Sequence, residues 1–151
     1  MKQVREQTID GFLFSTDKSR LDVPFIHAFI STSYWAEKIP VKILQDSIEH
    51  SLAFGVYEHA KQVGFARVIT DYSTFGYLAD VFIDENYRGR GLSKNLMTFI
   101  FSTPGFDKLR RFILATRDAH GLYEQFGFKP LKAPERFMEI AQPDIYKKIN
   151  N

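Results

Sequence analysis

The chain has 151 residues, of which 44% are hydrophobic and 25% are charged, and these values fit one folded domain that spans residues 1–151. Its 20 basic and 18 acidic side chains leave a net charge of +2, which argues against nucleic acids and membrane surfaces as partners. The chain has no cysteine, which excludes disulfides, thiolate metal sites and a cysteine nucleophile. No apolar run has the length of a signal peptide or a membrane span, so we expect a cytoplasmic protein.

The first elements in chain order are a strand and two helices. Residues 8–15 mix apolar and polar side chains in the manner of a strand. Asp22 is suited to cap a helix and Pro24 to lie in its first turn, and the apolar residues that follow have helical spacing. A second helix is expected from Pro40 onward, and the loop between the two helices carries Tyr34 and Trp35.

The middle of the chain has the alternation of β-strands. Residues 52–57 and 63–70 are expected to form a hairpin, and residues 77–83 a further strand. In that strand the alternation places Leu78, Asp80 and Phe82 on one face.

A helical stripe that begins at Leu92 follows and ends before a Thr-Pro-Gly sequence at residues 103–105. Residues 112–115 are expected to form a short strand, and residues 118–126 a helix that Asp118 caps and Gly127 closes. Two closing strands are expected, from Phe128 onward and over residues 136–141. The order of the elements predicts an α/β domain with a mixed sheet, antiparallel in its first half.

The connection between the strand at residues 77–83 and the next helix contains Gly89 and Gly91. Glycine permits a positive φ and leaves no Cβ between the backbone and a ligand. Backbone amides in such a turn, at the start of a helix, form an anion site that suits phosphate, and Arg88, Arg90 and Lys94 add positive charge. The simpler alternative is a tight turn with solvated arginines.

Two common phosphate motifs do not fit this segment. A nucleotide P-loop needs four residues between its first glycine and Gly-Lys-Ser/Thr, and the chain has no such spacing. A dinucleotide fingerprint needs a third glycine where Lys94 stands, and it needs an early parallel βαβ unit.

The sequence Arg88-Gly-Arg-Gly-Leu-Ser93 resembles the acyl-CoA signature Gln/Arg-x-x-Gly-x-Gly/Ala of the GNAT superfamily of N-acyltransferases, with Ser93 in the last position. A second block, residues 119–128, resembles the Ala-x-x-Leu-Tyr-x-x-x-Gly-Phe segment of the same superfamily. The order of elements is also similar, so the resemblance spans nearly the whole chain. It implies a mixed, mostly antiparallel sheet of about seven strands with about four helices, in which strands four and five splay apart.

The resemblance implies acetyl-CoA as co-substrate, with its pantetheine arm between the splayed strands and no metal. The residues that it places on the coenzyme are Val81, Phe82, Ile83, Arg88, Gly89, Arg90, Gly91, Leu92, Ser93, Lys94 and Thr116. Thr116 stands where the superfamily frequently has asparagine.

The resemblance makes Tyr123 the general acid that protonates the departing thiolate, and a phenol with a pKa of about 10 is protonated at neutral pH. The alternative for Tyr123 is a core aromatic. The acceptor amine must be neutral when it attacks, and the base is Asp80, His120 or a water molecule. Asp80 is a carboxylate in an apolar strand, and its alternative role is a bond to the backbone or to a nearby arginine.

The resemblance implies that the loop between the first two helices shapes the acceptor site, so Tyr34 and Trp35 are candidates for substrate binding, or else plug the core. We therefore expect an N-acetyltransferase in which the primary amine of a small molecule or peptide attacks acetyl-CoA directly in a ternary complex. The alternative is a catalytically idle acyl-CoA-binding module on the same fold. A homodimer is compatible with the sequence, which identifies neither the acceptor, the acyl length nor the oligomeric state.

Overall fold

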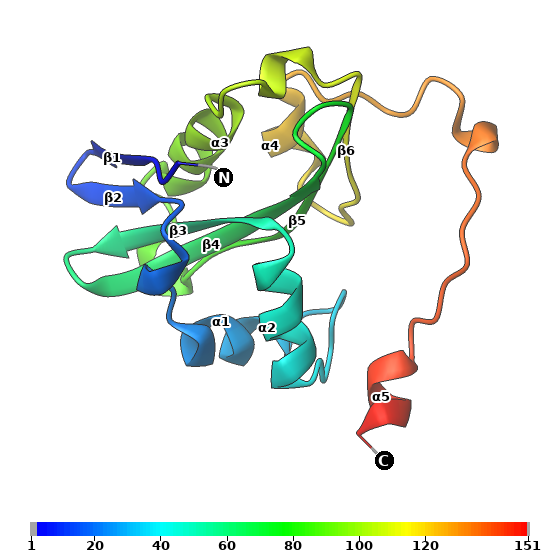
Figure 1. Ribbon diagram of the computed structural model, residues 1–151, viewed down its shortest axis with the longest axis horizontal. Helices are drawn as coiled ribbons and strands as arrows, with labels where there is room; N and C mark the ends of the chain where they lie inside the picture. Colours follow the sequence, from blue (N-terminus) through cyan, green and yellow to red (C-terminus); the bar gives the residue numbers. More distant parts are fainter. Residues whose placement is uncertain (1–2, 151) are drawn as a thin grey trace.

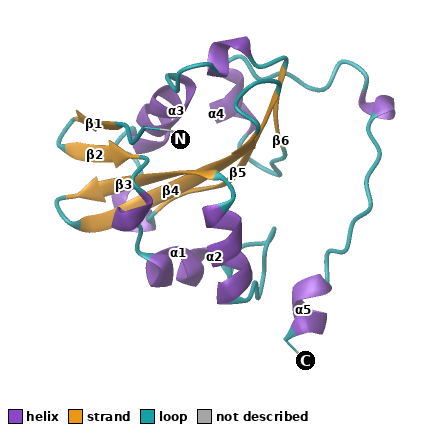
Figure 2. Ribbon diagram, viewed as in Figure 1, coloured by secondary structure: helices purple, strands orange, loops and turns teal. Residues whose placement is uncertain are grey.

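The computed structural model describes residues 3–150, which form one mixed sheet with helices on both faces (Figures 1 and 2). The strands are β1 Glu6–Ile9, β2 Phe12–Ser15, β3 Leu52–Glu58, β4 Lys61–Thr70, β5 Phe75–Ile83 and β6 Arg111–Leu114. The α-helices are α1 Val23–Ile30, α2 Val41–Glu49, α3 Leu92–Phe101, α4 His120–Glu124 and α5 Ile145–Ile149. Short 3-10 turns lie at Lys18–Arg20, Glu85–Tyr87, Phe106–Lys108 and Pro134–Arg136.

The six strands pair in the order in which they occur along the chain. The first five are antiparallel to their neighbours, and β6 pairs in parallel with β5. The expected α/β class and mixed sheet are therefore confirmed, with six strands in place of about seven. None of the helices within residues 3–150 is long and apolar enough to cross a membrane.

Two apolar clusters hold the helices against the sheet. On one face, residues of α3 and Tyr123 of α4 pack against β2 to β5. On the other face, Ile26 and Ile30 of α1 and Leu44 and Ile48 of α2 pack against the sheet. Asp22 caps α1 as expected, since its side chain accepts a hydrogen bond from the Phe25 amide at 3.1 Å.

Three expectations about the elements are wrong. Residues 8–15 do not form one strand, because a turn at Asp10 and Gly11 with φ of 52° and 83° folds them into the hairpin of β1 and β2. Helix α4 is shorter than residues 118–126, and Asp118 does not cap it. Residues after Phe128 form no strand, because no neighbouring strand within residues 3–150 pairs with them.

The segment after α4 leaves the body of the molecule instead of closing the sheet. It runs outward as an extended arc and returns at α5, on the side of α1 and α2 (Figure 1). There the Asn150 side chain donates a hydrogen bond to the Lys38 carbonyl at 2.7 Å, and Tyr146 packs against the cluster of α1 and α2. We call residues 129–144 the strap.

Candidate active site

The strands β5 and β6 separate at the middle of the sheet. Their parallel pairing ends at Leu78 and Leu114, although β5 continues to Ile83. In the same region β5 has one residue more than β4, since Asp80 and Val81 lie opposite Ala66. Such a bulge increases the local twist of a strand, so the end of β5 turns away from β6. The splayed pair of strands expected from the sequence is confirmed.

The bulge also changes which face each side chain of β5 occupies. Leu78 packs in the cluster beside α3, whereas Phe82 packs in the cluster beside α1 and α2. The prediction that Leu78, Asp80 and Phe82 share one face is therefore wrong. The physical reason is that one extra residue, Asp80 with a φ of 56°, interrupts the period of two.

The turn that follows β5 presents free backbone amides at the start of α3. Gly89 and Gly91 have φ of 79° and 75°, which L-residues rarely adopt, and no side chain caps the helix. The backbone amides of residues 89–94 donate to no acceptor in the described part of the chain. Because these amides lie at the start of a ten-residue helix, they are positioned to hold an anionic group.

The basic side chains of this turn have different surroundings. Arg88 lines a cavity, and its Nε donates to the Ile83 carbonyl at 3.2 Å. Arg90 lies over the ring of Tyr87, 4.9 Å from its centre, and Lys94 is exposed. Leu92 is buried in the core, so only its backbone is available to a ligand.

A cavity of about 810 Å³ lies beside this turn. It is bounded by the loop between α1 and α2, the end of β5, the start of α3, and α4. The predicted site residues that line it are Tyr34, Trp35, Val81, Phe82, Ile83, Arg88, Ser93 and Tyr123. The structure thus brings residues from both sequence motifs to one cavity, together with Glu37 and Arg117.

Tyr123, a residue of α4, lines one wall of this cavity. The residue is 9% exposed, and its ring packs edge-on against Phe128 with centroids 6.1 Å apart. Its hydroxyl has no hydrogen-bond partner among residues 3–150. Burial, with smaller contributions from Tyr34 and Asp118, raises the pKa of Tyr123 to about 12. The phenol therefore stays protonated at neutral pH and is free to donate.

Asp80 is buried behind the wall of the cavity and does not line it. One carboxylate oxygen accepts a hydrogen bond from the Trp35 indole at 2.7 Å, and the other accepts from Arg67 Nε at 2.6 Å. Both side chains of the ion pair are largely buried. Of the two structural partners considered for Asp80, the backbone and a nearby arginine, the structure shows the arginine, and the role of Asp80 as the base stays a prediction.

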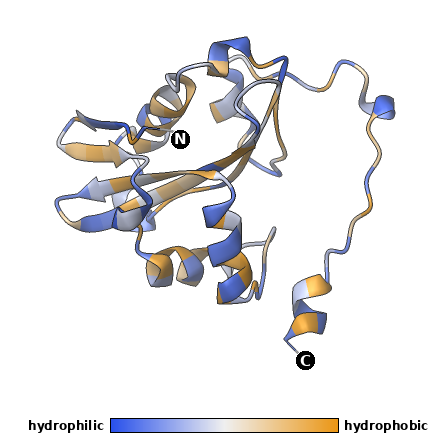
Figure 3. Ribbon diagram, in the orientation of Figure 1, coloured by the Kyte–Doolittle hydropathy of each residue, from blue (hydrophilic) through white to orange (hydrophobic). Residues whose placement is uncertain are grey.

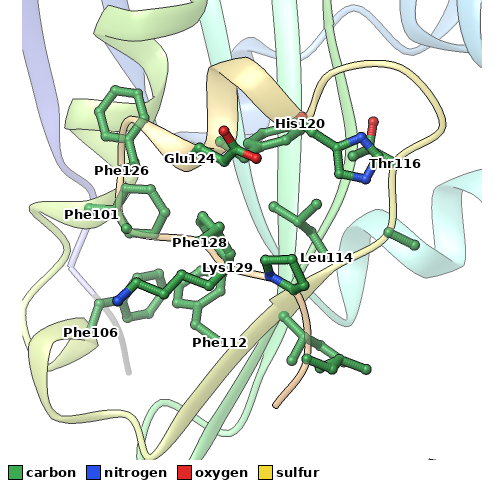
Figure 4. A pocket seen from close by; sticks show the side chains of 16 residues that line it. Phe101, Phe106, Phe112, Leu114, Thr116, His120, Glu124, Phe126, Phe128 and Lys129 are labelled. Atoms are coloured by element: carbon green, nitrogen blue, oxygen red, sulfur yellow. The ribbon is translucent and has the colours of Figure 1, made fainter. Parts of the chain in front are cut away.

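Two other residues that the sequence analysis considered for the site, Thr116 and His120, do not line this cavity. Thr116 uses its hydroxyl to accept a hydrogen bond from the Ala119 amide at 3.1 Å, and so supports the start of α4. His120, the first residue of α4, is exposed and lines a different cavity together with Thr116, on the side of β6 (Figure 4).

Two arginines that the sequence motifs do not single out support the loop between α1 and α2, Arg67 through Asp80 and Arg117 by direct contact. Arg67 interrupts an apolar run of β4, and such an interruption is a visible signal. Arg117 contacts Tyr34, which is 83 positions away, and no local pattern indicates such a contact.

The chain is similar to known proteins in sequence and in fold. Residues 49–130, more than half of the chain, match the family model described as "Acetyltransferase (GNAT) domain". A Gibberella zeae protein whose name assigns it to the acetyltransferases is 33% identical over 144 residues, with 81% of each chain covered.

Solved structures have the same fold. A GNAT-family crystal structure from Xanthomonas campestris pv. campestris is 46% identical, covers 97% of this chain and 98% of its own, and has a TM-score of 0.86. A structure from Clostridium acetobutylicum, solved with acetyl-CoA, is 11% identical with a TM-score of 0.60 and covers 92% and 95%, which is a likeness of fold alone.

Proposed function

The chain belongs to the acetyltransferase (GNAT) domain family and is an acyltransferase, and from this premise we propose that it transfers an acetyl group from acetyl-CoA to a primary amine. The observation that carries the proposal is the turn at residues 89–94, whose unpaired amides lie beside the cavity that contains Tyr123. Acetyl-CoA supplies a thioester carbon for the amine to attack and a thiolate that leaves.

The residues of the turn fit the diphosphate of the coenzyme. Apart from the adjoining backbone, no protein atom lies within 4 Å of where a Cβ would stand at Gly89 or Gly91, so the space beside them is open to a ligand. Arg88 adds positive charge at the cavity, and the small Ser93 lines it. The separated ends of β5 and β6 leave backbone groups near Val81 for the pantetheine arm.

Tyr123 is the proposed proton donor. Its hydroxyl has no partner in the described residues, and its raised pKa keeps the proton on the phenol throughout the neutral range. A donor with a pKa above that of a simple thiol, about 8.5, stabilises a departing thiolate by hydrogen bonding before a full proton transfer.

The acceptor side of the cavity is formed by the loop between α1 and α2. Tyr34 and Trp35 offer aromatic surfaces, and Glu37 offers a negative charge that attracts a cationic amine. A cavity of about 810 Å³ is within the usual range for small-ligand sites. It must hold both the acyl end of the donor and the acceptor, so we propose a small amine or the end of a peptide, reacting directly in a ternary complex.

The test has two independent readouts. Calorimetric titration with coenzyme A measures binding, and release of free thiol from acetyl-CoA measures turnover with amino acids, polyamines, aminoglycosides and short peptides. We expect binding, and thiol release with at least one amine class. Binding without turnover across the panel would favour the idle acyl-CoA-binding module, and failure to bind coenzyme A would refute both functions.

A further inference from the structure

The connection between β6 and α4 brings an arginine to the cavity of about 810 Å³. β6 is mostly apolar, and the connection that follows it turns hydrophilic at Arg117 and Asp118 (Figure 3). Among residues 3–150 the guanidinium of Arg117 forms no ion pair and donates no hydrogen bond. Arg67, by contrast, is paired with Asp80 behind the wall of the cavity. Arg117 therefore keeps its full capacity to bind an anion.

The contact with Tyr34 orients this guanidinium and leaves its donors free. The guanidinium lies over the Tyr34 ring, 3.9 Å from the ring centre, which is the distance of direct contact with the ring face. The five N–H groups of a guanidinium lie in its plane, so packing on a ring does not occupy them. Arg117 therefore presents a fixed fork of donors, and such a fork fits both oxygens of a carboxylate.

The other charged residues of the lining show what kind of ligand fits. Glu37 and Asp118 line the same cavity and belong to no ion pair in the described part of the chain. Arg88 belongs to the turn for the diphosphate, and its Nε already donates to the Ile83 carbonyl. A small molecule with both an ammonium and a carboxylate complements these charges. A polyamine or an aminoglycoside would add positive charge and leave Arg117 without a partner.

We propose that the acceptor is an amino acid and that Arg117 binds its carboxylate. The proposal rests on the proposed acetyl transfer and names the acceptor class for it. Glu37 and Asp118 attract the ammonium, which gives one proton to the base before it attacks. The nitrogen forms the new amide bond to the acyl carbon, and the carbon–sulfur bond breaks with its electron pair on sulfur. The sulfur takes the proton of Tyr123, and the second proton that the nitrogen loses restores the phenol.

The first experiment compares amino acids with their own amides by thiol release from acetyl-CoA. Glycine, L-alanine, β-alanine and 4-aminobutyrate vary the separation between the amine and the carboxylate. Each amide lacks the negative charge, and its amine is less basic, so more of it is neutral at a given pH. A preference for the acid therefore reports recognition of the carboxylate. We expect kcat/KM of the acid to exceed that of the amide about 10- to 100-fold for at least one pair.

The second experiment assigns this preference to Arg117. Arg117→Gln should lower kcat/KM about 10- to 100-fold for the acid and less than about threefold for the amide. Arg117→Lys, which keeps the charge without the fork, should retain part of the preference. The matched control is Arg111→Gln, because Arg111 lies over the ring of Phe137 in the strap, at 4.9 Å, and does not line the cavity. An equal loss for acid and amide in Arg117→Gln would mean that Arg117 only holds the loop of Tyr34, and would overturn the proposal.

Binding measurements separate this proposal from the function on which it rests. Titration of the four amino acids into protein saturated with coenzyme A should give a heat of binding that Arg117→Gln loses. Coenzyme A itself should bind the unaltered chain and Arg117→Gln equally, and a roughly tenfold loss in the variant would assign Arg117 to the coenzyme and overturn the proposal. Thiol release with polyamines or aminoglycosides but with no amino acid would also overturn it and would leave acetyl transfer standing. Failure of the unaltered chain to bind coenzyme A would refute acetyl transfer itself.

Discussion

Tyr34 and Arg117 are joined twice across the cavity. The Arg117 amide donates a hydrogen bond to the Tyr34 hydroxyl at 3.1 Å, and the Arg117 guanidinium lies 3.9 Å from the centre of the Tyr34 ring. The two residues belong to the loop between α1 and α2 and to the connection between β6 and α4. One pair of residues therefore fixes the loop between α1 and α2 against the segment that leads to Tyr123.

Tyr34→Phe should weaken this link without removing it, because the ring contact stays and only the hydrogen bond is lost. A hydrogen bond of this kind contributes about 0.5–1.5 kcal/mol, so we expect a roughly 2- to 10-fold rise in the KM of the amine. The KM of acetyl-CoA should change little. Tyr34→Ala, which loses both contacts, should have the larger effect, and equal amine KM values for the two variants would contradict the link.

Tyr123→Phe should slow turnover about 10²- to 10⁴-fold, the usual contribution of a general acid. Coenzyme binding should be nearly unchanged, because the ring and its packing on Phe128 are retained. Steady-state kinetics and calorimetry measure the two effects separately. Tyr77→Phe is the matched control, since it removes a hydroxyl from β5 outside the lining of the cavity. Full activity of Tyr123→Phe would exclude the proposed acid.

Gly91→Ala should impair coenzyme binding by more than its cost in stability. An alanine with positive φ costs about 1–2 kcal/mol, and its methyl group would also occupy the open space of the proposed diphosphate site. Gly11→Ala is the control, because Gly11 has a similar φ of 83° and equally open surroundings in the turn between β1 and β2. Both variants should lose similar stability in urea, and only Gly91→Ala should lose coenzyme affinity, by about tenfold or more.

Asp80→Asn should act through Trp35. The amide oxygen can still accept from the indole, but Arg67 loses its charged partner, and removal of one partner from a buried ion pair costs about 3–5 kcal/mol. We expect lower stability and a higher KM for the amine, while the turnover rate should change less than about fivefold.

Trp35→Phe, which removes the indole donor, should reproduce this KM effect. A different outcome for Asp80→Asn would identify Asp80 as the general base. In that case turnover would be slowed by about 10²-fold or more, and the acidic limb of the pH–rate profile would be lost.

Alkaline pH should destabilise the fold through buried tyrosines. Burial raises the pKa of Tyr123 to about 12 and also raises that of Tyr57, while an unfolded tyrosine titrates near 10. Above pH 10 the unfolded chain loses protons that the folded chain retains. The free energy of unfolding therefore falls as pH rises from 10 to 12. Urea unfolding over this range should show a smaller loss for Tyr123→Phe than for the unaltered chain, and identical slopes would contradict the buried phenol.

Most elements that depend on local patterns could be predicted from the sequence. Asp22, Pro24 and the apolar spacing of α1 are such patterns, as is the left-handed Gly127 after α4. The hairpin of β1 and β2 was missed although Asp10-Gly11 is a strong turn signal, because the apolar residues on either side of it also suit one continuous strand.

Other features depend on distant contacts and have no local pattern. The bulge at Asp80 becomes visible only when β5 is paired with β4, and it decides which side of the sheet Phe82 occupies. The segment at residues 136–141 has the pattern of a strand, but a strand also needs a neighbour, and that neighbour is not supplied within residues 3–150. The glycine turn and Tyr123 followed from two motifs, and Arg67 could have been noticed because it interrupts an apolar run, whereas the contact of Arg117 with Tyr34 became apparent only from the folded chain.

Tyr123 contributes to the lining of both cavities, the one beside the glycine turn and the one beside β6. Its ring is thus a shared wall between the two cavities, and Phe128, which lines the cavity beside β6, packs against that ring. A change in the packing beside β6 would therefore displace the phenol in the other cavity, so that turnover would respond to a substitution far from the coenzyme and the amine.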